Sequence, residues 1–301
     1  MNLIGEIAAL LTAVCWSFNS LVFTRAGKRV GAVTVNSFRL WIALPALALL
    51  HWLLFGTPFP FTIETDRFLY LGVSGIIGFV IGDGMLFESF LMIGPRLAML
   101  LALLTPVFST VLAWGLLGET LLPLEIVSIL VTIAGIAWVV TEETAPAVAL
   151  IAEPPRRRRL GVLLAVGGAL GQAVGLMFSK LGLAGGFSAI SATHVRVSAA
   201  ALALVVLSLG QGKFRTHWAR MKDRAALLEI TAGALTGPVL GVTLSLVAIA
   251  HAPIGIASTL MSLTPVLLLP ASHFLFKEKI TLRAILGTLV ALLGVILLFL
   301  S

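Results

Sequence analysis

Long apolar stretches follow one another along nearly the whole chain, separated by short segments that hold most of the charges. Ten of these stretches approach or reach the roughly 20 residues that an α-helix needs to cross a bilayer. They cover residues 3–24, 34–55, 68–91, 94–117, 122–140, 160–182, 188–209, 226–249, 253–276 and 280–300. The pattern predicts an all-α membrane protein with ten transmembrane helices and little chain left for a soluble domain.

The composition of the 301-residue chain agrees with this prediction. Hydrophobic residues make up 59% of it and charged residues 11%, whereas a soluble protein has about 25% charged residues. The net charge of +7 would suggest nucleic-acid binding in a soluble protein, but here the basic residues lie between the apolar stretches. We expect no nucleic-acid partner, no cofactor and no metal site, since Cys15 is the single cysteine.

Lysines and arginines are distributed unevenly between the two sides of the predicted bundle. Ten spans place both termini on one side, where the loops hold only Arg67 and Lys180. Loops on the opposite side hold Arg25, Lys28, Arg29, Arg96, Arg156, Arg157, Arg158, Arg159, Lys213, Arg215, Arg220, Lys222, Arg224, Lys277, Lys279 and Arg283. Because positive charge marks the cytoplasmic side, we expect cytoplasmic basic loops and outer termini in a bacterial-type inner (plasma) membrane.

The chain contains an internal repeat. Leu104-Thr105-Pro106-Val107 recurs 159 residues later as Leu263-Thr264-Pro265-Val266, and Glu119 and Glu278 follow at the same distance. An offset of 157 residues pairs Arg39 with Arg196 in the second and seventh helices. Each copy holds five helices, an odd number, so the copies must insert with opposite orientations. We predict two inverted five-helix repeats around a central cavity, residues 1–140 and 160–301, joined by a cytoplasmic linker at 141–159.

Smaller patterns predict how the helices pack and where one of them meets the membrane surface. Gly167, Gly171 and Gly175 recur every four residues, as do Gly233, Gly237 and Gly241, which predicts close helix packing. Residues 211–224 are basic, with Phe214, Trp218 and Met221 at helical spacing. This segment fits either a short helix on the inner membrane surface or a solvated loop whose charges only fix the topology.

Asp83 and Arg196 are the main candidate site residues, because a charge deep in a bilayer costs about 2.5–3.5 kcal/mol on insertion scales. Asp83 either couples transport to protons, binds a substrate ammonium group, or forms a structural pair with Arg39. The position that matches Asp83 in the second repeat is Val242, so Arg196 lacks that partner. We expect Arg196 to face the cavity and bind an anionic group; the alternative is bonding to carbonyl oxygens of a neighbouring helix.

Further polar residues complete the candidate site. The substrate-binding candidates besides Arg196 are Trp16, Asn19, Gln172 and His194. The two Thr-Pro pairs are candidate hinges or cavity walls: Thr105 with Pro106, and Thr264 with Pro265. Glu119 and Glu278 are expected to cap short turns at helix ends.

These features together resemble the drug/metabolite transporter superfamily, in particular its EamA-type ten-helix branch. The resemblance rests on the duplicated five-helix unit, the two Thr-Pro pairs, Gly118-Glu119 and Lys277-Glu278, Arg39, and Gly135 with Gly294. It implies a secondary transporter that exports or exchanges small metabolites through a cavity between the repeats. The expected partners are a small-molecule substrate, coupling protons and the lipid bilayer, for a monomer or a homodimer.

A different class of function competes with this one. Gly72-Val73-Ser74-Gly75 fits a nucleophile motif of intramembrane serine proteases, with His194 as the base that would activate Ser74. Such short patterns arise easily in glycine-rich helices, and ten duplicated helices do not fit that family. A membrane receptor or scaffold is a third class, but it explains neither the inversion nor the paired prolines. We therefore expect a transporter rather than an enzyme.

Overall fold

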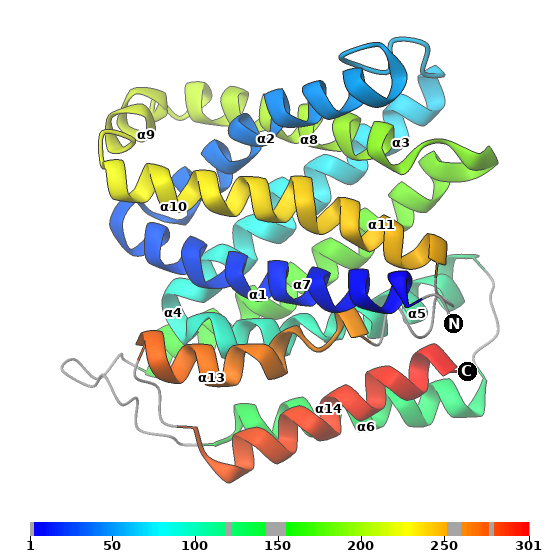
Figure 1. The fold of residues 1–301 in the computed structure, drawn as a ribbon. Coiled ribbons are helices and arrows are strands. Elements are labelled where there is room, and N and C mark those ends of the chain that lie inside the picture. The colour runs from blue at the N-terminus through cyan, green and yellow to red at the C-terminus, as the bar shows by residue number, and fades with distance from the viewer. Residues whose placement is uncertain (1–2, 118–121, 143–154, 252–259, 277–279, 301) are drawn as a thin grey trace.

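The computed structural model describes residues 3–117, 122–142, 155–251, 260–276 and 280–300, which form helices and connections without any strand (Figure 1). The first half contains α1 (Ile4–Val30), α2 (Ala32–Phe55), α3 (Thr65–Gly75), the π-helix η1 (Ile76–Gly82), α4 (Asp83–Ala102), α5 (Leu104–Leu117) and α6 (Pro123–Val140). The second half contains α7 (Pro155–Leu183), the short 3₁₀ turn η2 (Ala184–Gly186), α8 (Ala189–Gly210), α9 (Phe214–Arg220), α10 (Arg224–Ala234), the π-helix η3 (Leu235–Gly241), α11 (Val242–His251), α13 (Thr264–Phe276) and α14 (Leu282–Leu300).

Eight helices in the described ranges are long and apolar enough to cross a membrane. Two shorter apolar helices, Leu104–Gly115 and Thr264–Phe276, lie where the sequence predicts the fourth and ninth spans. The third predicted span and the first residues of the fourth run together over Thr65–Ala102, but the chain breaks at Gly94, whose φ is +80°. Only glycine adopts this conformation readily, and Pro95 disfavours a helical residue before it. Residues 252–259, at the start of the ninth predicted span, lie outside the described residues.

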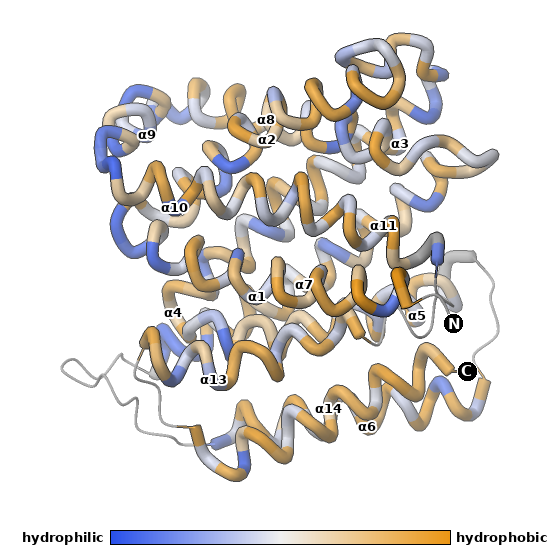
Figure 2. Tube along the Cα trace, viewed as in Figure 1, coloured by the Kyte–Doolittle hydropathy of each residue, from blue (hydrophilic) through white to orange (hydrophobic). Residues whose placement is uncertain are grey.

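Apolar side chains cover much of the outer surface of the bundle (Figure 2). Leu53, Leu163 and Leu202, on three different helices, are 72%, 67% and 65% exposed. A water-soluble protein rarely exposes large contiguous apolar areas, whereas apolar surface is what a bilayer requires of a helix bundle.

Helices of the first half pack against helices of the second half in a reciprocal way. α2 lies along α8, and α6 lies along α14. α1 packs on the continuous segment α10–η3–α11, and α7 packs on the continuous segment α3–η1–α4. The 159-residue offset of the repeat superimposes these two segments, and it carries η1 (Ile76–Gly82) onto η3 (Leu235–Gly241) residue for residue. Both copies therefore contain a π-helix at the same place.

Glycine contacts explain how closely these segments approach. A Cβ atom on Gly171 would lie 2.9 Å from the Cα of Gly82, and one on Gly175 would lie 3.1 Å from the Cα of Gly78. Real Cβ atoms hardly ever come this close to backbone, so only glycine allows α7 its present distance from η1. The four-residue glycine spacing in α7 thus marks a true packing seam, as predicted.

Basic residues gather at one end of the bundle. The N- and C-termini lie at one end (Figure 1), whereas hydrophilic residues gather around α9 and the adjoining ends of α1 and α10 at the other (Figure 2). At this second end the Lys28 ammonium lies 4.7 Å from the ring centre of Phe276, so the end of α13 is there as well.

Candidate functional site

A buried polar cluster lies where α2, α4 and α7 meet. Arg39 of α2 donates through Nη2 to Oδ2 of Asp83, the first residue of α4, and the two side chains are only 5% and 11% exposed. Gln172 of α7 donates through Nε2 to the other carboxylate oxygen of Asp83, at 2.5 Å. Asn36, one turn before Arg39, accepts from Arg39 Nε at 3.0 Å. Both oxygens of the buried carboxylate are therefore hydrogen-bonded, as a buried charge requires.

Aromatic rings and a second arginine surround this ion pair. The Arg39 guanidinium lies 4.6 Å from the ring centre of Phe87, and 5.8 Å from that of Phe79. Arg196 of α8 lies over the same Phe79, at 4.7 Å from its ring centre. The Nε of Arg196 is buried and has no hydrogen-bond partner among the described residues. Two guanidinium groups and one carboxylate give the cluster a formal charge of +1.

Two side-chain amides bind the two π-helices at equivalent places. Gln172 Nε2 donates to the carbonyl oxygen of Gly78 in η1, at 3.1 Å. With its amide oriented to make every bond, Asn19 of α1 accepts from the backbone nitrogen of Gly237 in η3 at 3.0 Å and donates to the carbonyl oxygen of Gly233 at 2.6 Å. The 159-residue offset matches Gly78 to Gly237. A π-helix distorts the regular pattern of backbone hydrogen bonds. In a membrane, side chains must bond the backbone N–H and C=O groups that the distortion leaves without a partner.

His194 lies two residues from Arg196 but outside this cluster. Its ring contacts those of Phe59 and His51, with centres 5.1 and 5.9 Å apart. His51 Nδ1 donates to the carbonyl oxygen of Thr57 at 2.6 Å, and His51 Nε2 hydrogen-bonds with the hydroxyl of Ser191 at 3.0 Å. A pocket of about 560 Å³ opens beside these residues, lined by His51, Ser191 and the segments around residues 57–67 and 185–188.

The remaining candidates lie apart from the cluster. Trp16 is 37% exposed on α1, and no described contact joins it to Asp83 or Arg196. Thr105 with Pro106 and Thr264 with Pro265 lie in the first turns of α5 and α13, where a proline removes no helical hydrogen bond. The carbonyl oxygen of Thr264 accepts from Ser17 of α1 at 3.3 Å. Glu119 and Glu278 lie outside the described residues.

Ser74, the nucleophile of the hydrolase alternative, has a structural partner. Its side chain is fully buried, and its hydroxyl donates to the carbonyl oxygen of Gly175 on α7 at 2.5 Å. The described contacts of His194 are with Phe59 and His51 rather than with Ser74. The arrangement does not favour a serine hydrolase.

Two members of the cluster, Asn36 and Phe79, are not among the residues predicted from the sequence. Asn36 precedes Arg39 by three residues, so helical spacing alone could have placed the two on one face. Nothing in the sequence distinguishes Phe79 from the sixteen other phenylalanines.

Comparison with known proteins identifies the kind of protein to which this cluster belongs. The family model of the EamA-like transporter family matches twice, over residues 3–141 and 159–300. The chain belongs to the EamA-like transporter family. It is therefore a multi-pass membrane transporter of the drug/metabolite type. This EamA-like chain is also similar to a solved structure entitled "Crystal structure of protein", with a TM-score of 0.62 and 17% identity over 97% of this chain and 95% of the other. That likeness concerns the fold alone. A comparison with curated proteins gives no match.

Proposed function

We propose that this EamA-like chain is a secondary active transporter that exports small organic metabolites of the amino-acid or a related class by alternating access. The observation that carries the proposal is the buried cluster of Arg39, Asp83, Gln172 and Arg196, because it joins α2 and α4 of the first half to α7 and α8 of the second. In alternating access one repeat rocks against the other around a central site. Because the cluster spans both halves, the distances between its side chains change whenever one half moves against the other.

The charges of the cluster support a substrate with a carboxylate and an ammonium group. Arg39 and Asp83 pair with each other, whereas Arg196 has no carboxylate within 4.0 Å among the described residues. A substrate carboxylate would supply the missing negative charge, and guanidinium groups bind carboxylates in a well-defined geometry. A substrate ammonium group would compete with a proton for Asp83. Competition of this kind couples outward movement of substrate to inward movement of protons, so that an inward proton gradient drives export.

The packing supports an arrangement of ten helices in two inverted repeats, residues 1–140 and 160–301, around a central cavity, with residues 141–159 as the cytoplasmic linker. The π-helices recur at the repeat offset, and α1 packs on one of them as α7 packs on the other. In this arrangement the Thr-Pro pairs at residues 105–106 and 264–265 act as hinges or cavity walls. The basic loops face the cytoplasm and the termini face outward in an inner (plasma) membrane.

A metabolite screen tests the class of substrate. Cells with and without the protein are compared by untargeted analysis of the medium, and the solutes that differ are then tested with purified protein in proteoliposomes under an imposed proton gradient. We expect net export of an amino-acid-like solute together with proton uptake. The absence of any difference for any solute would count against export.

Two substitutions then test the roles of the cluster. Arg196→Gln removes a charge-assisted hydrogen bond to the substrate, so the half-saturating concentration should rise about 10- to 100-fold. Asp83→Asn should abolish proton-driven net export. Arg156→Gln, an exposed arginine at the end of α7, serves as the matched control and should leave both quantities unchanged. Unaltered kinetics in Arg196→Gln would contradict the proposed role of Arg196.

A further inference from the structure

The short helix α9 is fixed to the end of the bundle by aromatic contacts. Trp218 packs against Phe38 and Trp41 of α2, with ring centres 5.7 and 6.2 Å apart. Phe214 stacks on Trp218 at 6.2 Å and meets Trp41 at 5.9 Å. These four rings hold the helix against α2, so its outer face has a defined position.

Polar contacts tie the same helix to the junction of α1 and α2. Arg220 donates through Nη1 to the carbonyl oxygen of Val30 at 3.1 Å, and Thr34 hydrogen-bonds with His217 Nδ1 at 2.9 Å. Gly31, the junction residue, has a φ of +86°, and a Cβ there would lie 3.2 Å from Arg220 Nη1. These bonds fix the positions of Arg220 and His217, and Arg220 keeps its positive charge because a carbonyl oxygen does not neutralise it.

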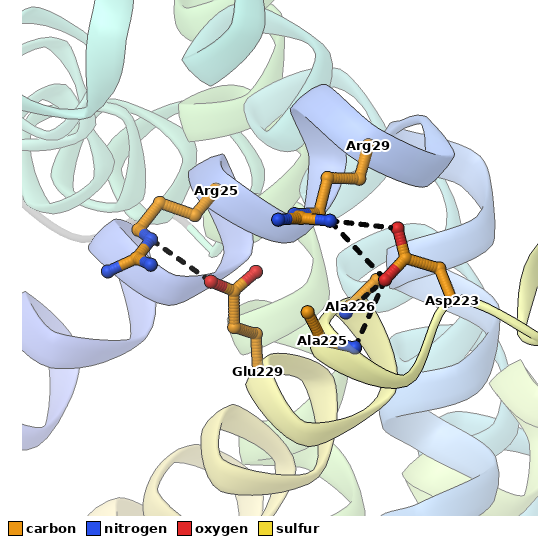
Figure 3. Close-up of polar contacts among 6 residues, drawn as sticks. All are labelled: Arg25, Arg29, Asp223, Ala225, Ala226 and Glu229. Atoms are coloured by element: carbon orange, nitrogen blue, oxygen red, sulfur yellow. Dashed lines mark hydrogen bonds and ion pairs between the residues drawn. The ribbon is translucent and has the colours of Figure 1, made fainter.

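The nearest acidic side chains are occupied by arginines of α1 (Figure 3). Arg29 Nη1 lies 3.1 Å from Oδ2 of Asp223, whose Oδ1 also accepts from the backbone nitrogens of Ala225 and Ala226 at the start of α10. Arg25 Nε lies 3.0 Å from Oε1 of Glu229. Neither carboxylate is left to neutralise the cations around α9.

Four further exposed cations lie around α9, and we define them as the α9 cation surface: Lys213, Arg215, Lys222 and Arg224. Among the described residues none of the four makes an ion pair. Exposed apolar side chains lie beside them, since Trp218 is 58% and Leu228 71% exposed. Cations next to exposed apolar groups at the end of membrane-spanning helices lie at the level of lipid headgroups.

We infer that the α9 cation surface binds the headgroups of anionic phospholipids in the cytoplasmic leaflet, where the proposed orientation places it. The unpaired positive charge complements a phosphate diester, and Trp218 and Leu228 would contact the acyl chains below it. This binding is independent of the transported substrate, because the α9 cation surface shares no residue with the Asp83 cluster. Clusters of lysine and arginine at this position next to a membrane attract anionic lipid by about fivefold per charge.

The test compares two double variants with the wild-type protein. Arg215→Gln/Arg224→Gln removes two charges from the α9 cation surface, and Arg156→Gln/Arg159→Gln removes two exposed charges from α7 as the matched control. Each protein is purified in detergent, checked for folding by size-exclusion chromatography, and titrated with phosphatidylglycerol or phosphatidylcholine while native mass spectrometry counts the bound lipids. Inorganic phosphate is added in a separate arm to detect a site for the free anion.

We expect the wild-type protein and the α7 variant to retain phosphatidylglycerol in preference to phosphatidylcholine. The α9 variant should bind phosphatidylglycerol about 30-fold more weakly, and 1 M salt should release the lipid from the wild-type protein. Equal binding of the two lipids, an equal loss in both double variants, or displacement of phosphatidylglycerol by millimolar phosphate would overturn the inference. The transport assay is read separately, because lipid binding in detergent does not depend on any substrate.

Discussion

The ion pair between Arg39 and Asp83 allows a quantitative test of what Asp83 does. Removing one partner of a buried pair leaves an uncompensated charge and costs about 3–5 kcal/mol of stability. Each partner here retains a second contact: Asp83 keeps the bond from Gln172 at 2.5 Å, and Arg39 keeps Asn36 at 3.0 Å and the face of Phe87. We therefore expect Arg39→Gln and Asp83→Asn each to cost about 3 kcal/mol, at the lower end of that range.

The double variant Arg39→Gln/Asp83→Asn shows whether the stability losses of the two single changes add or depend on each other. It replaces one positive and one negative charge by two neutral amides, so the formal charge of the cluster stays at +1, carried by Arg196. We expect it to cost about 3 kcal/mol instead of the 6 that addition would give, which corresponds to a coupling energy of about 3 kcal/mol. Thermal unfolding in detergent can be followed with a thiol-reactive dye, because Cys15 on α1 is the single cysteine and is half-buried. The shift is about 2–4 °C per kcal/mol for proteins of 150–250 residues and smaller for longer chains, so each single change should lower Tm of this 301-residue chain by about 5 °C.

Two outcomes of this cycle would refute the reasoning. Additivity within about 0.5 kcal/mol would mean that Arg39 and Asp83 do not depend on each other in the folded protein. Proton-driven export by the double variant would mean that Asp83 serves only as a structural partner. If Asp83 couples transport to protons, the double variant should be more stable than the sum of the two single changes predicts. It should nevertheless remain inactive in proton-driven export.

Two further predictions concern the helix seams and α9. Gly135→Ala should destabilise the protein by about 1–3 kcal/mol, because the added Cβ would meet the backbone of Ala291 where α6 packs on α14. Gly115→Ala is the control: its Cβ would meet nothing within 4 Å, so it should be neutral or slightly stabilising in the same unfolding assay. Equal effects of the two changes would contradict the close packing of α6 on α14. Burial, followed by the charges of Arg220 and Lys213, lowers the pKa of His217, so the undocked helix binds a proton more readily and the docking of α9 should weaken as pH falls below about 6.5. Hydrogen exchange of α9 amides should show this acid response in the wild-type protein and not in His217→Gln, and an unchanged response would locate the titrating group elsewhere.

Several features of the fold follow from the sequence because they depend only on spacing. The four-residue spacing of glycines in α7 identifies the face that meets η1, since residues four apart share one side of a helix. The repeat offset of 159 residues predicts that equivalent segments share their local structure, and η1 and η3 do so. The contact between Arg39 and Asp83 is foreseeable because the cost of burying each charge in a membrane requires a partner.

Other features depend on helix rotation and backbone detail that spacing does not encode. The π-helices η1 and η3 change the direction of every later side chain on their segments, which is why no pattern in the sequence shows that Gln172 reaches both Gly78 and Asp83. In the described residues eight helices meet the length and apolarity required of a span, and the apolar helices at the fourth and ninth predicted spans are shorter. The first residues of the fourth predicted span belong to α4, which continues past the break at Gly94. Apolar runs alone cannot locate such a break.

The two halves of this EamA-like protein differ in chemistry while they share a framework. Asn19 binds η3 at Gly237 as Gln172 binds η1 at Gly78, so the amide contact is present in both copies. Gln172 also hydrogen-bonds the carboxylate of Asp83, the residue that directly follows η1. The residue that follows η3, 159 positions later, is Val242, so Asn19 has no equivalent carboxylate to bind. If the copies are inverted as proposed, their common parts can exchange conformations symmetrically during transport, but the charged cluster belongs to one side of the pseudo-symmetry axis. The substrate should then bind off that axis, against η1 and α8, in both the inward- and the outward-facing states.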